Sequence, residues 1–219
     1  LVKGVAQACM AVGCSLIGGE TAELPGIYLE EECDLAGFIV GVVEKDAVLD
    51  GSTIALGDVL LGVPSNGLHT NGYSLARRVF RVEENPAVLG RTMPELGRTL
   101  GEALLEPHRC YYPLLEPVLP HIKGMAHITG GGLLENVPRV LPKGLGAWFN
   151  TSTWEVPPIF TLIQETGRVE REEMFRVFNM GVGMVLVCAP EKVSEVRRLV
   201  PEALVVGEVT RGIEIVLSR

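Results

Sequence analysis

Short apolar runs of strand length alternate with amphipathic stretches of helical period along most of this chain. The apolar runs predict strands over residues 58–64, 123–128, 144–149, 181–188, 203–209 and 213–217. The amphipathic stretches predict helices over residues 71–82, 94–104, 108–119, 158–166, 170–177 and 191–199. Arg211 and Gly212, between the last two strands, predict a two-residue hairpin turn. This order of elements is typical of an α/β (α+β) fold with a mixed sheet.

The first residues carry apolar positions at helical spacing. These positions are Val2, Val5, Ala6, Cys9, Met10 and Gly13. Residues 15–17 and 35–43 are apolar runs that predict two more strands, the second of them buried on both faces. Because the chain opens on Leu1, inside the helical pattern and without a capping residue, we expect it to be part of a longer protein.

A polar, turn-rich stretch over residues 44–58 predicts a domain boundary. One domain is expected over residues 1–46 and another over residues 47–219. A chain of 219 residues with 47% hydrophobic content can bury a substantial core in this arrangement.

Charge and cysteine usage narrow the range of partners and compartments. The formal net charge is −8 and no run of Lys or Arg exceeds a pair, so no broad surface for nucleic acid or anionic membrane is expected. The five cysteines are scattered without a CxxC pair, which is typical of free thiols in a reducing cytosol. No apolar run of transmembrane length and no signal-peptide pattern occurs, so we expect a cytoplasmic protein.

Three consecutive glycines, Gly130, Gly131 and Gly132, follow the predicted strand 123–128 and precede a helix-compatible stretch that carries Asn136. Without Cβ atoms, their N–H groups can approach a ligand closely. At the start of a helix such groups favour an anion, usually phosphate. The spacing matches neither the Walker motif nor the dinucleotide fingerprint. The alternative is a turn in which glycine is required by the backbone alone.

Short hydrogen-bonding side chains surround a histidine where the predicted strand 58–64 ends. They are Ser65, Asn66, Thr70 and Asn71, with His69 between them. At the mouth of the following helix, an imidazole suits proton transfer or the orientation of a substrate amide. A surface or helix-capping histidine is the alternative, but the polar neighbours at a strand end favour a functional role.

Glu20 follows two glycines and the predicted strand 15–17. A carboxylate in this position suits Mg²⁺, which takes oxygen ligands and shares them with nucleotide phosphates. A loop or helix-capping carboxylate is an equally good interpretation of Glu20.

Residues 179–184, with the sequence NMGVGM, form a minor fourth segment. Its glycines permit a bulge or a close approach, and structural packing is the favoured explanation. His108 and His121 have no partner at metal-ligand spacing, so the sequence predicts no metal site at either.

Five segments, in order over essentially the whole chain, resemble one family. They are GGETAELPG at 18–26, DLAGFIVGVVEKD at 34–46, SNGLHTNGYSLAR at 65–77, HITGGGLLENVPRVLP at 127–142 and FNMGVGM at 178–184. The chain resembles the phosphoribosylformylglycinamidine cyclo-ligases, also called aminoimidazole ribonucleotide synthetases, of purine biosynthesis. Leu24 stands where Met is more usual in that family, a near-isosteric difference.

The resemblance implies a mixed-sheet, two-domain fold of the aminoimidazole ribonucleotide synthetase type. The family's nucleotide- and metal-binding aspartate segments, including a DGVGTK-type motif, do not occur here. The first domain is therefore expected to be incomplete and the second complete, and this chain alone is expected to be inactive. The resemblance also implies a homodimer joined through the first domain, with residues 35–43 at the interface.

The activity implied by the resemblance is the ATP-dependent cyclisation of formylglycinamidine ribonucleotide to aminoimidazole ribonucleotide, with Mg²⁺ as the metal. The formamide oxygen would attack the γ-phosphate, and the amidine nitrogen would then close the ring with loss of phosphate. The protein would steady phosphate charge and hold the substrate in ring-closing geometry.

The resemblance also assigns roles to particular residues. Glu20 would bind the metal, and His69 and Asn71 would act at the reacting end of the substrate. The residues expected to bind phosphate or substrate are Ser65, Asn66, Thr129, Gly130, Gly131, Gly132 and Asn136. Two other functions stay open. One is another ATP-dependent enzyme of the same superfamily, such as a small-molecule kinase or a formylglycinamidine synthetase. The other is a non-catalytic ligand-binding or dimerisation fragment.

Overall fold

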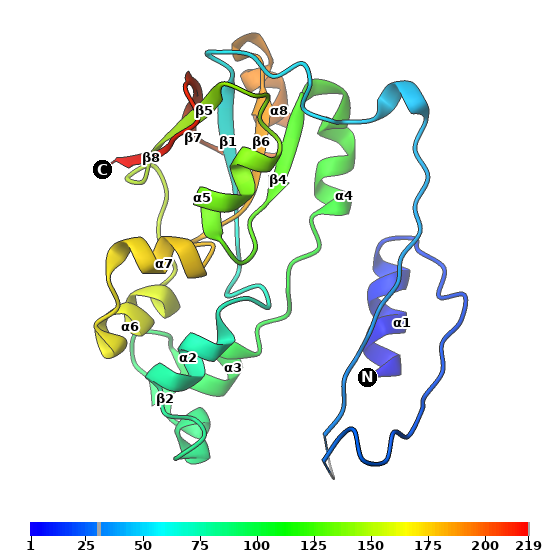
Figure 1. Cartoon of the computed structure of the whole chain (residues 1–219), viewed down its shortest axis with the longest axis vertical. Coiled ribbons are helices and arrows are strands. Elements are labelled where there is room, and N and C mark those ends of the chain that lie inside the picture. The colour runs from blue at the N-terminus through cyan, green and yellow to red at the C-terminus, as the bar shows by residue number, and fades with distance from the viewer. Residues whose placement is uncertain (30–31, 219) are drawn as a thin grey trace. The chain divides into compact units, whose positions relative to one another are not determined.

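The structure is a computed structural model that describes residues 1–29 and 32–218. These residues form two compact units, Leu1–Val48 and Leu49–Arg219. The first unit contains helix α1 (Val2–Ala11) and the short 3₁₀ helix η1 (Lys45–Ala47) (Figure 1). The helix predicted from the first apolar positions is therefore confirmed.

The prediction of two strands in the first unit is wrong. Neither residues 15–17 nor residues 35–43 form a strand. A strand is stable only when a neighbour takes up its backbone N–H and C=O groups. Among the described residues of this unit, the only β-pairing is an isolated bridge. The apolar side chains of residues 35–43 are accordingly exposed, with Phe38 at 95% and Val42 at 99%.

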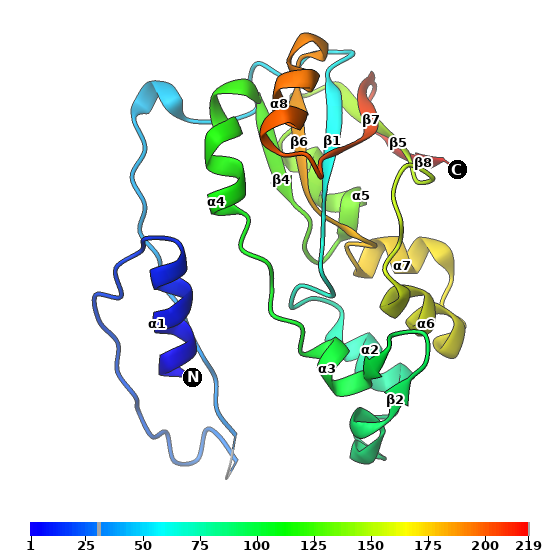
Figure 2. The same ribbon diagram turned by 180° about the vertical axis from the view of Figure 1, so that it is seen from behind.

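The second unit is built on a six-stranded sheet in the order β4-β6-β1-β7-β5-β8 (Figures 1 and 2). Its strands are β1 (Val59–Pro64), β4 (Gly124–His127), β5 (Leu145–Asn150), β6 (Val182–Cys188), β7 (Leu204–Arg211) and β8 (Ile215–Ser218). All the neighbouring pairs are antiparallel except β5 and β8, which are parallel. The mixed sheet and the six strands predicted for this part of the chain are confirmed.

The hairpin turn predicted at Arg211 and Gly212 is wrong. Strand β7 lies between β1 and β5, so both of its edges are already hydrogen-bonded. Strand β8 instead pairs with the far edge of β5. The chain therefore passes the end of β5 after β7 rather than folding back beside it.

The α-helices of the second unit are mostly shorter than the amphipathic pattern predicts. They are α2 (Tyr73–Val79), α3 (Leu100–Leu104), α4 (Tyr112–Leu115), α5 (Gly132–Asn136), α6 (Pro158–Gly167), α7 (Arg171–Val177) and α8 (Val193–Leu199). The helix predicted over 158–166 is confirmed at full length as α6. Four 3₁₀ helices accompany the α-helices: η2 (Pro86–Gly90), η3 (Glu116–His121), η4 (Val137–Arg139) and η5 (Pro190–Lys192). Prolines cause one of the differences, because Pro117 falls in the helix predicted over 108–119 and Pro120 directly follows it, and this stretch divides into α4 and η3.

The helix predicted over 94–104 begins only at Leu100. A small hairpin, β2 (Thr92–Met93) with β3 (Arg98–Thr99), occupies the preceding residues. Thr99 and Glu102 then form a reciprocal capping box that fixes the helix start.

Apolar side chains cover both faces of the sheet. Successive residues of β1 point to opposite faces, so Leu60 belongs to one buried cluster and Leu61 to the other. The first cluster also contains residues of α5, α6 and α7, and the second contains residues of α4, η3 and α8. Figures 1 and 2 show α5 on one side of the sheet and α8 on the other. With both faces covered, the exposed strand ends are where polar chemistry can gather.

Candidate functional site

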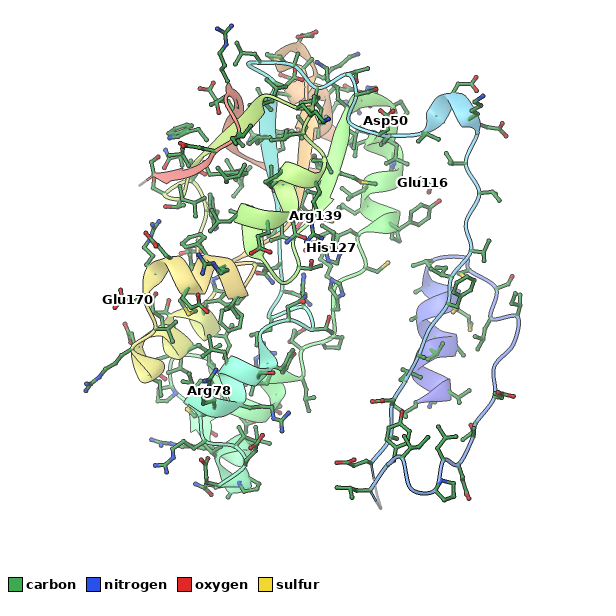
Figure 3. All side chains as sticks on the ribbon, in the orientation of Figure 1. Asp50, Arg78, Glu116, His127, Arg139 and Glu170 are labelled. Atoms are coloured by element: carbon green, nitrogen blue, oxygen red, sulfur yellow. The ribbon has the colours of Figure 1, made fainter. Side chains whose placement is uncertain are left out.

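Strands β1 and β4 end close together at one end of the sheet. Each is antiparallel to β6, so the two run in the same direction. Val63 of β1 and His127 of β4 both pair with Met184 of β6. The turn after β1 and the glycine loop after β4 therefore begin on either side of β6. Figure 3 labels His127 at this end of β4.

Asn71 joins the turn after β1 to the glycine loop. Its Oδ1 accepts a hydrogen bond from the Gly130 N–H at 3.0 Å, and its Nδ2 donates to the His69 carbonyl oxygen at 2.8 Å. Both ends of the amide are thus engaged by the protein. In this structure Asn71 positions the two segments relative to one another.

His69 is buried in the turn, with 1% of its surface exposed. Its Nε2 lies 2.5 Å from Oδ1 of Asn66, while Nδ2 of Asn66 donates to the Pro107 carbonyl oxygen at 2.8 Å. The Pro107 contact fixes which end of the Asn66 amide carries oxygen. Nδ1 of His69 is buried and has no hydrogen-bond partner in the described chain. His69 and Thr70 both have positive φ, at 54° and 64°, so the turn is held in a sparsely populated conformation.

Two further histidines, which sequence reasoning left without a role, lie against His69. The ring centroids of His69 and His108 are 4.2 Å apart, and those of His108 and His127 are 5.1 Å apart. Burial lowers the pKa of His69 to about 4, and the neighbouring His108, His127 and Arg109 add to that shift. Desolvation also lowers the pKa of His108 and of His127. The three imidazoles, which we call the histidine cluster, are therefore neutral at pH 7.

The glycine loop uses most of its N–H groups internally. Gly130 donates to Asn71, and Gly132 donates to the Thr129 carbonyl oxygen at 3.0 Å. Gly131 donates to no protein group within residues 1–29 and 32–218, so it is the member of the triplet whose N–H can receive an anion. Positive φ at Gly131 (97°) and Gly132 (59°) also gives the loop a backbone requirement for glycine. The helix that follows, α5, is short, so its dipole adds little.

Hydrogen bonds from Asn136 and Thr129 hold the glycine loop in its conformation. Oδ1 of Asn136 accepts from Oγ1 of Thr129 at 3.0 Å, and its Nδ2 donates to the carbonyl oxygens of Gly132 at 2.8 Å and Gly130 at 3.2 Å. Asn136 is buried. The sequence predicted that the Asn136 amide binds a phosphate. In the structure this amide points into the loop and holds its backbone through hydrogen bonds.

Replacing Asn136 by Ala should lower the free energy of unfolding by about 2–4 kcal/mol, because buried carbonyl and hydroxyl groups of the loop lose their partner. Asn85→Ala is the matched control. Asn85 is exposed and makes no side-chain capping hydrogen bond, so its loss should cost less than about 0.5 kcal/mol. Urea unfolding of both variants measures the difference. Equal costs would show that the loop does not depend on Asn136.

Ser65 is tied to the segment that precedes β6. Its Oγ donates to Oδ1 of Asn179 at 2.7 Å, and Nδ2 of Asn179 donates to the Gly67 carbonyl oxygen at 2.8 Å. Ser65 and Asn179 are both buried. The β1–β6 register shifts at Val63 and Pro64, as the prediction of a bulge in residues 179–184 requires. A Cβ on Gly183 would lie 1.9 Å from the Tyr111 hydroxyl, so the predicted close approach is confirmed there.

Glu20 lies in the first unit and is exposed. Within residues 1–29 and 32–218, the one group of three or more His, Cys, Asp or Glu side chains with ligand atoms close enough to hold a metal is the histidine cluster. Glu20 therefore belongs to no cluster of potential metal ligands among the described residues.

Two surface hollows lie away from these residues. One is beside α2, lined by Arg77, Arg78 and neighbouring polar side chains, and the other lies over β5 and β7 near Trp148. Neither includes a predicted site residue. The candidate site is defined by converging side chains at the strand ends, not by either hollow.

Comparison with known families identifies the fold that carries this arrangement. The family model described as AIR synthase related protein, C-terminal domain, matches residues 55–218. The chain belongs to this family. The match includes the whole sheet, the turn after β1 and the glycine loop.

Curated relatives carry the name that the sequence resemblance indicates. The chain is 50% identical over 218 residues to the phosphoribosylformylglycinamidine cyclo-ligase of Caldicellulosiruptor bescii, covering 97% of this chain and 64% of that protein. It is 51% identical over 218 residues to the protein of the same name from Geobacillus thermodenitrificans, covering 97% of this chain and 63% of that one. The chain thus spans less than two thirds of the length of these relatives.

Solved structures share the fold at low sequence identity. Thiamine-monophosphate kinase from Stenotrophomonas maltophilia aligns with a TM-score of 0.55 and 14% identity, over 80% of this chain and 54% of that one. The hydrogenase maturation protein HypE, in complex with ATP, aligns with a TM-score of 0.55 and 11% identity, over 80% of this chain and 51% of that one. Among the described residues, no helix has the length and apolarity needed to cross a membrane.

Proposed function

We propose that this chain carries the substrate-binding part of an ATP-dependent cyclo-ligase that converts formylglycinamidine ribonucleotide to aminoimidazole ribonucleotide. The balanced reaction consumes ATP and yields the cyclised product, ADP and phosphate. The proposal is supported by relatives at about half identity that bear the cyclo-ligase name and by the match to the AIR synthase related family.

The observation that carries the proposal is the hydrogen bond between Asn71 and the Gly130 N–H at 3.0 Å. It joins the turn that holds His69 to the loop that offers the Gly131 N–H. A nucleotide substrate needs an anion-binding group at its phosphate and a proton-transfer group at its reacting amide. The two halves of the proposed site supply one each, and Asn71 fixes their separation.

His69 is the proposed proton acceptor for ring closure. The amidine nitrogen must lose a proton when it attacks the activated formyl carbon. A neutral imidazole with a free lone pair accepts such a proton, and the lowered pKa of His69 keeps it neutral at pH 7. Nε2 is committed to Asn66, which leaves Nδ1 for the substrate. His108 lies over the His69 ring and is exposed, so it must turn aside to admit the substrate.

The loop side of the proposed site binds phosphate through backbone. Gly131 offers an N–H without a side chain to obstruct a ligand, and Thr129 and Asn136 stiffen the loop beneath it. A preorganised donor of this kind needs no reorganisation when the ligand arrives. Asn66 and Ser65 belong to the same proposed site as the residues that hold the His69 turn in place.

Further parts of the proposal follow from the family resemblance. We infer that Mg²⁺ accompanies ATP and that Glu20 contributes to binding it in the complete enzyme. We infer a cytoplasmic homodimer, with residues 35–43 at the subunit interface. The exposed Phe38 and Val42 support that interface, because a large apolar surface left in water is unfavourable.

The test is a product assay on a protein that carries this chain and spans the full length of its curated relatives. Formylglycinamidine ribonucleotide, ATP and Mg²⁺ are incubated with it, and the products are analysed by mass spectrometry. The proposal predicts a product lighter than the substrate by one water molecule, with equal amounts of ADP and phosphate. A product that gains a phosphoryl group would instead show a small-molecule kinase. Substrate and ATP left unchanged would contradict any catalytic function.

A further inference from the structure

Three of the four histidines of the chain meet although they are far apart in sequence. His69 comes from the turn after β1, His108 from the segment between α3 and α4, and His127 from the end of β4. One ring nitrogen from each comes within 4.8 Å of the corresponding atoms of the other two. The sequence gives no sign of this convergence, because none of the three is near another at metal-ligand spacing.

The donor set decides which kind of cation could bind. Three imidazole nitrogens are borderline ligands that suit Zn²⁺, Co²⁺ or Ni²⁺. Mg²⁺ and Ca²⁺ require oxygen ligands, and no carboxylate belongs to this group. Three histidines with an open fourth position are a known ligand set for Zn²⁺. The cluster is thus chemically distinct from the Mg²⁺ site that ATP chemistry calls for.

The hydrogen bonds of His69 leave a suitable lone pair. Nε2 of His69 lies 2.5 Å from Oδ1 of Asn66 and 3.2 Å from the Asn66 backbone nitrogen. In the tautomer that a cation on Nδ1 would select, Nε2 carries the proton and shares it with Oδ1 of Asn66. Nδ1 then keeps its lone pair, and it is buried without a partner in the described chain. A metal-bound histidine ordinarily has this arrangement, with one nitrogen on the metal and the other N–H on an oxygen.

The remaining distance can close by side-chain rotation. A tetrahedral ion with Zn–N bonds of 2.0–2.1 Å holds its nitrogens about 3.4 Å apart. The separations between the three ring nitrogens, which are within 4.8 Å, must therefore shorten by at most about 1.4 Å. His108 and His127 are exposed, so their rings can turn, whereas His69 is fixed in its turn.

We propose that His69, His108 and His127 form a binding site for a single borderline divalent cation of the Zn²⁺ class. The ion would engage Nδ1 of His69 and leave one coordination position for water or a ligand. A cation there takes up the lone pair that ring closure is proposed to use. Its binding is nevertheless independent of whether the protein is a cyclo-ligase.

The experiment uses the chain without a histidine tag and stripped of metal with a chelator. Zn²⁺ binding is measured by calorimetry, and Co²⁺ is used as a spectroscopic probe because tetrahedral nitrogen coordination gives it strong visible absorption. We expect one Zn²⁺ per chain, unaffected by excess Mg²⁺. His108→Ala and His127→Ala should each weaken binding by more than about 100-fold, since loss of a mere second-shell partner already costs about 10–100-fold.

His121→Ala is the matched control. His121 also has a buried Nδ1 without a partner in the described chain, but it lies outside the cluster. Its removal should leave Zn²⁺ affinity and the Co²⁺ spectrum unchanged. Circular dichroism confirms folding of each variant, and the exposure of His108 and His127 favours it. Absence of saturable Zn²⁺ binding, or equal affinity in His108→Ala and the unsubstituted chain, would overturn the proposal.

Discussion

Replacement of His69 by Asn should lower kcat by about 10²–10⁴-fold in a protein that carries this chain and spans the full length of its relatives. The reason is the loss of the imidazole proposed to accept the amidine proton through Nδ1, since Nε2 contacts Asn66. KM should change far less than kcat, because the substrate phosphate is proposed to bind the glycine loop and not His69. Steady-state kinetics at fixed pH measures both.

The buried position of His69 makes a stability control necessary. Asn removes an aromatic ring that packs against Tyr111 and His108, so the variant also loses folding free energy. The folded fraction is therefore measured by circular dichroism at the assay temperature, and rates are expressed per folded molecule. His121→Asn is the matched substitution, because His121 lies outside the cluster and should leave kcat unaltered. A His69→Asn protein that is less stable yet turns over normally would show that His69 has only a structural role.

Replacement of Gly132 by Ala should be the most damaging change in the glycine loop. A Cβ there would lie 1.8 Å from the Phe175 carbonyl oxygen, and the obstructing atom is backbone that cannot rotate away. The φ of 59° adds strain of about 1–2 kcal/mol for a residue with a Cβ. Overpacking against a fixed neighbour typically adds about 1–3 kcal/mol. The total is a large fraction of the stability of an ordinary domain.

Gly144→Ala separates the two contributions. Gly144 also has positive φ, at 85°, but a Cβ there would meet nothing within 4 Å. We expect Gly144→Ala to cost only the backbone strain and Gly132→Ala to cost about 1–3 kcal/mol more in urea unfolding. Similar costs would show that α5 and α7 separate easily, and the close packing of the loop on α7 would then be of no consequence.

The local pattern of apolar residues was enough to predict the strands of the second unit, but not which strands pair with one another in the sheet. Runs such as residues 181–188 are apolar throughout, and β6 is buried along its whole length. The order of strands depends on pairings distant in sequence, so the hairpin at Arg211 and Gly212 was wrong although the turn residues favoured it. Residues 35–43 failed for a related reason. An apolar run becomes a strand only where another strand is available to pair with it.

The candidate site divides in the same way. Glycine spacing and polar residues at a strand end marked Gly130–Gly132 and His69, and the structure places the two segments in contact through Asn71. The sequence could not predict the direction in which each side chain points. Asn136 and Ser65 are turned inward, against Thr129 and Asn179. The histidine cluster was missed because its members come from three separate connections, and only the fold brings them together.

The proposed function requires the His69 turn and the glycine loop to form one substrate site. The most direct test is a crystal structure of the full-length protein with formylglycinamidine ribonucleotide and a non-hydrolysable ATP analogue. We expect a phosphate oxygen about 2.9 Å from the Gly131 nitrogen, with the amidine of the same substrate beside Nδ1 of His69. A substrate bound elsewhere, with the Gly131 N–H donating to a protein group and His69 still covered by His108, would contradict it.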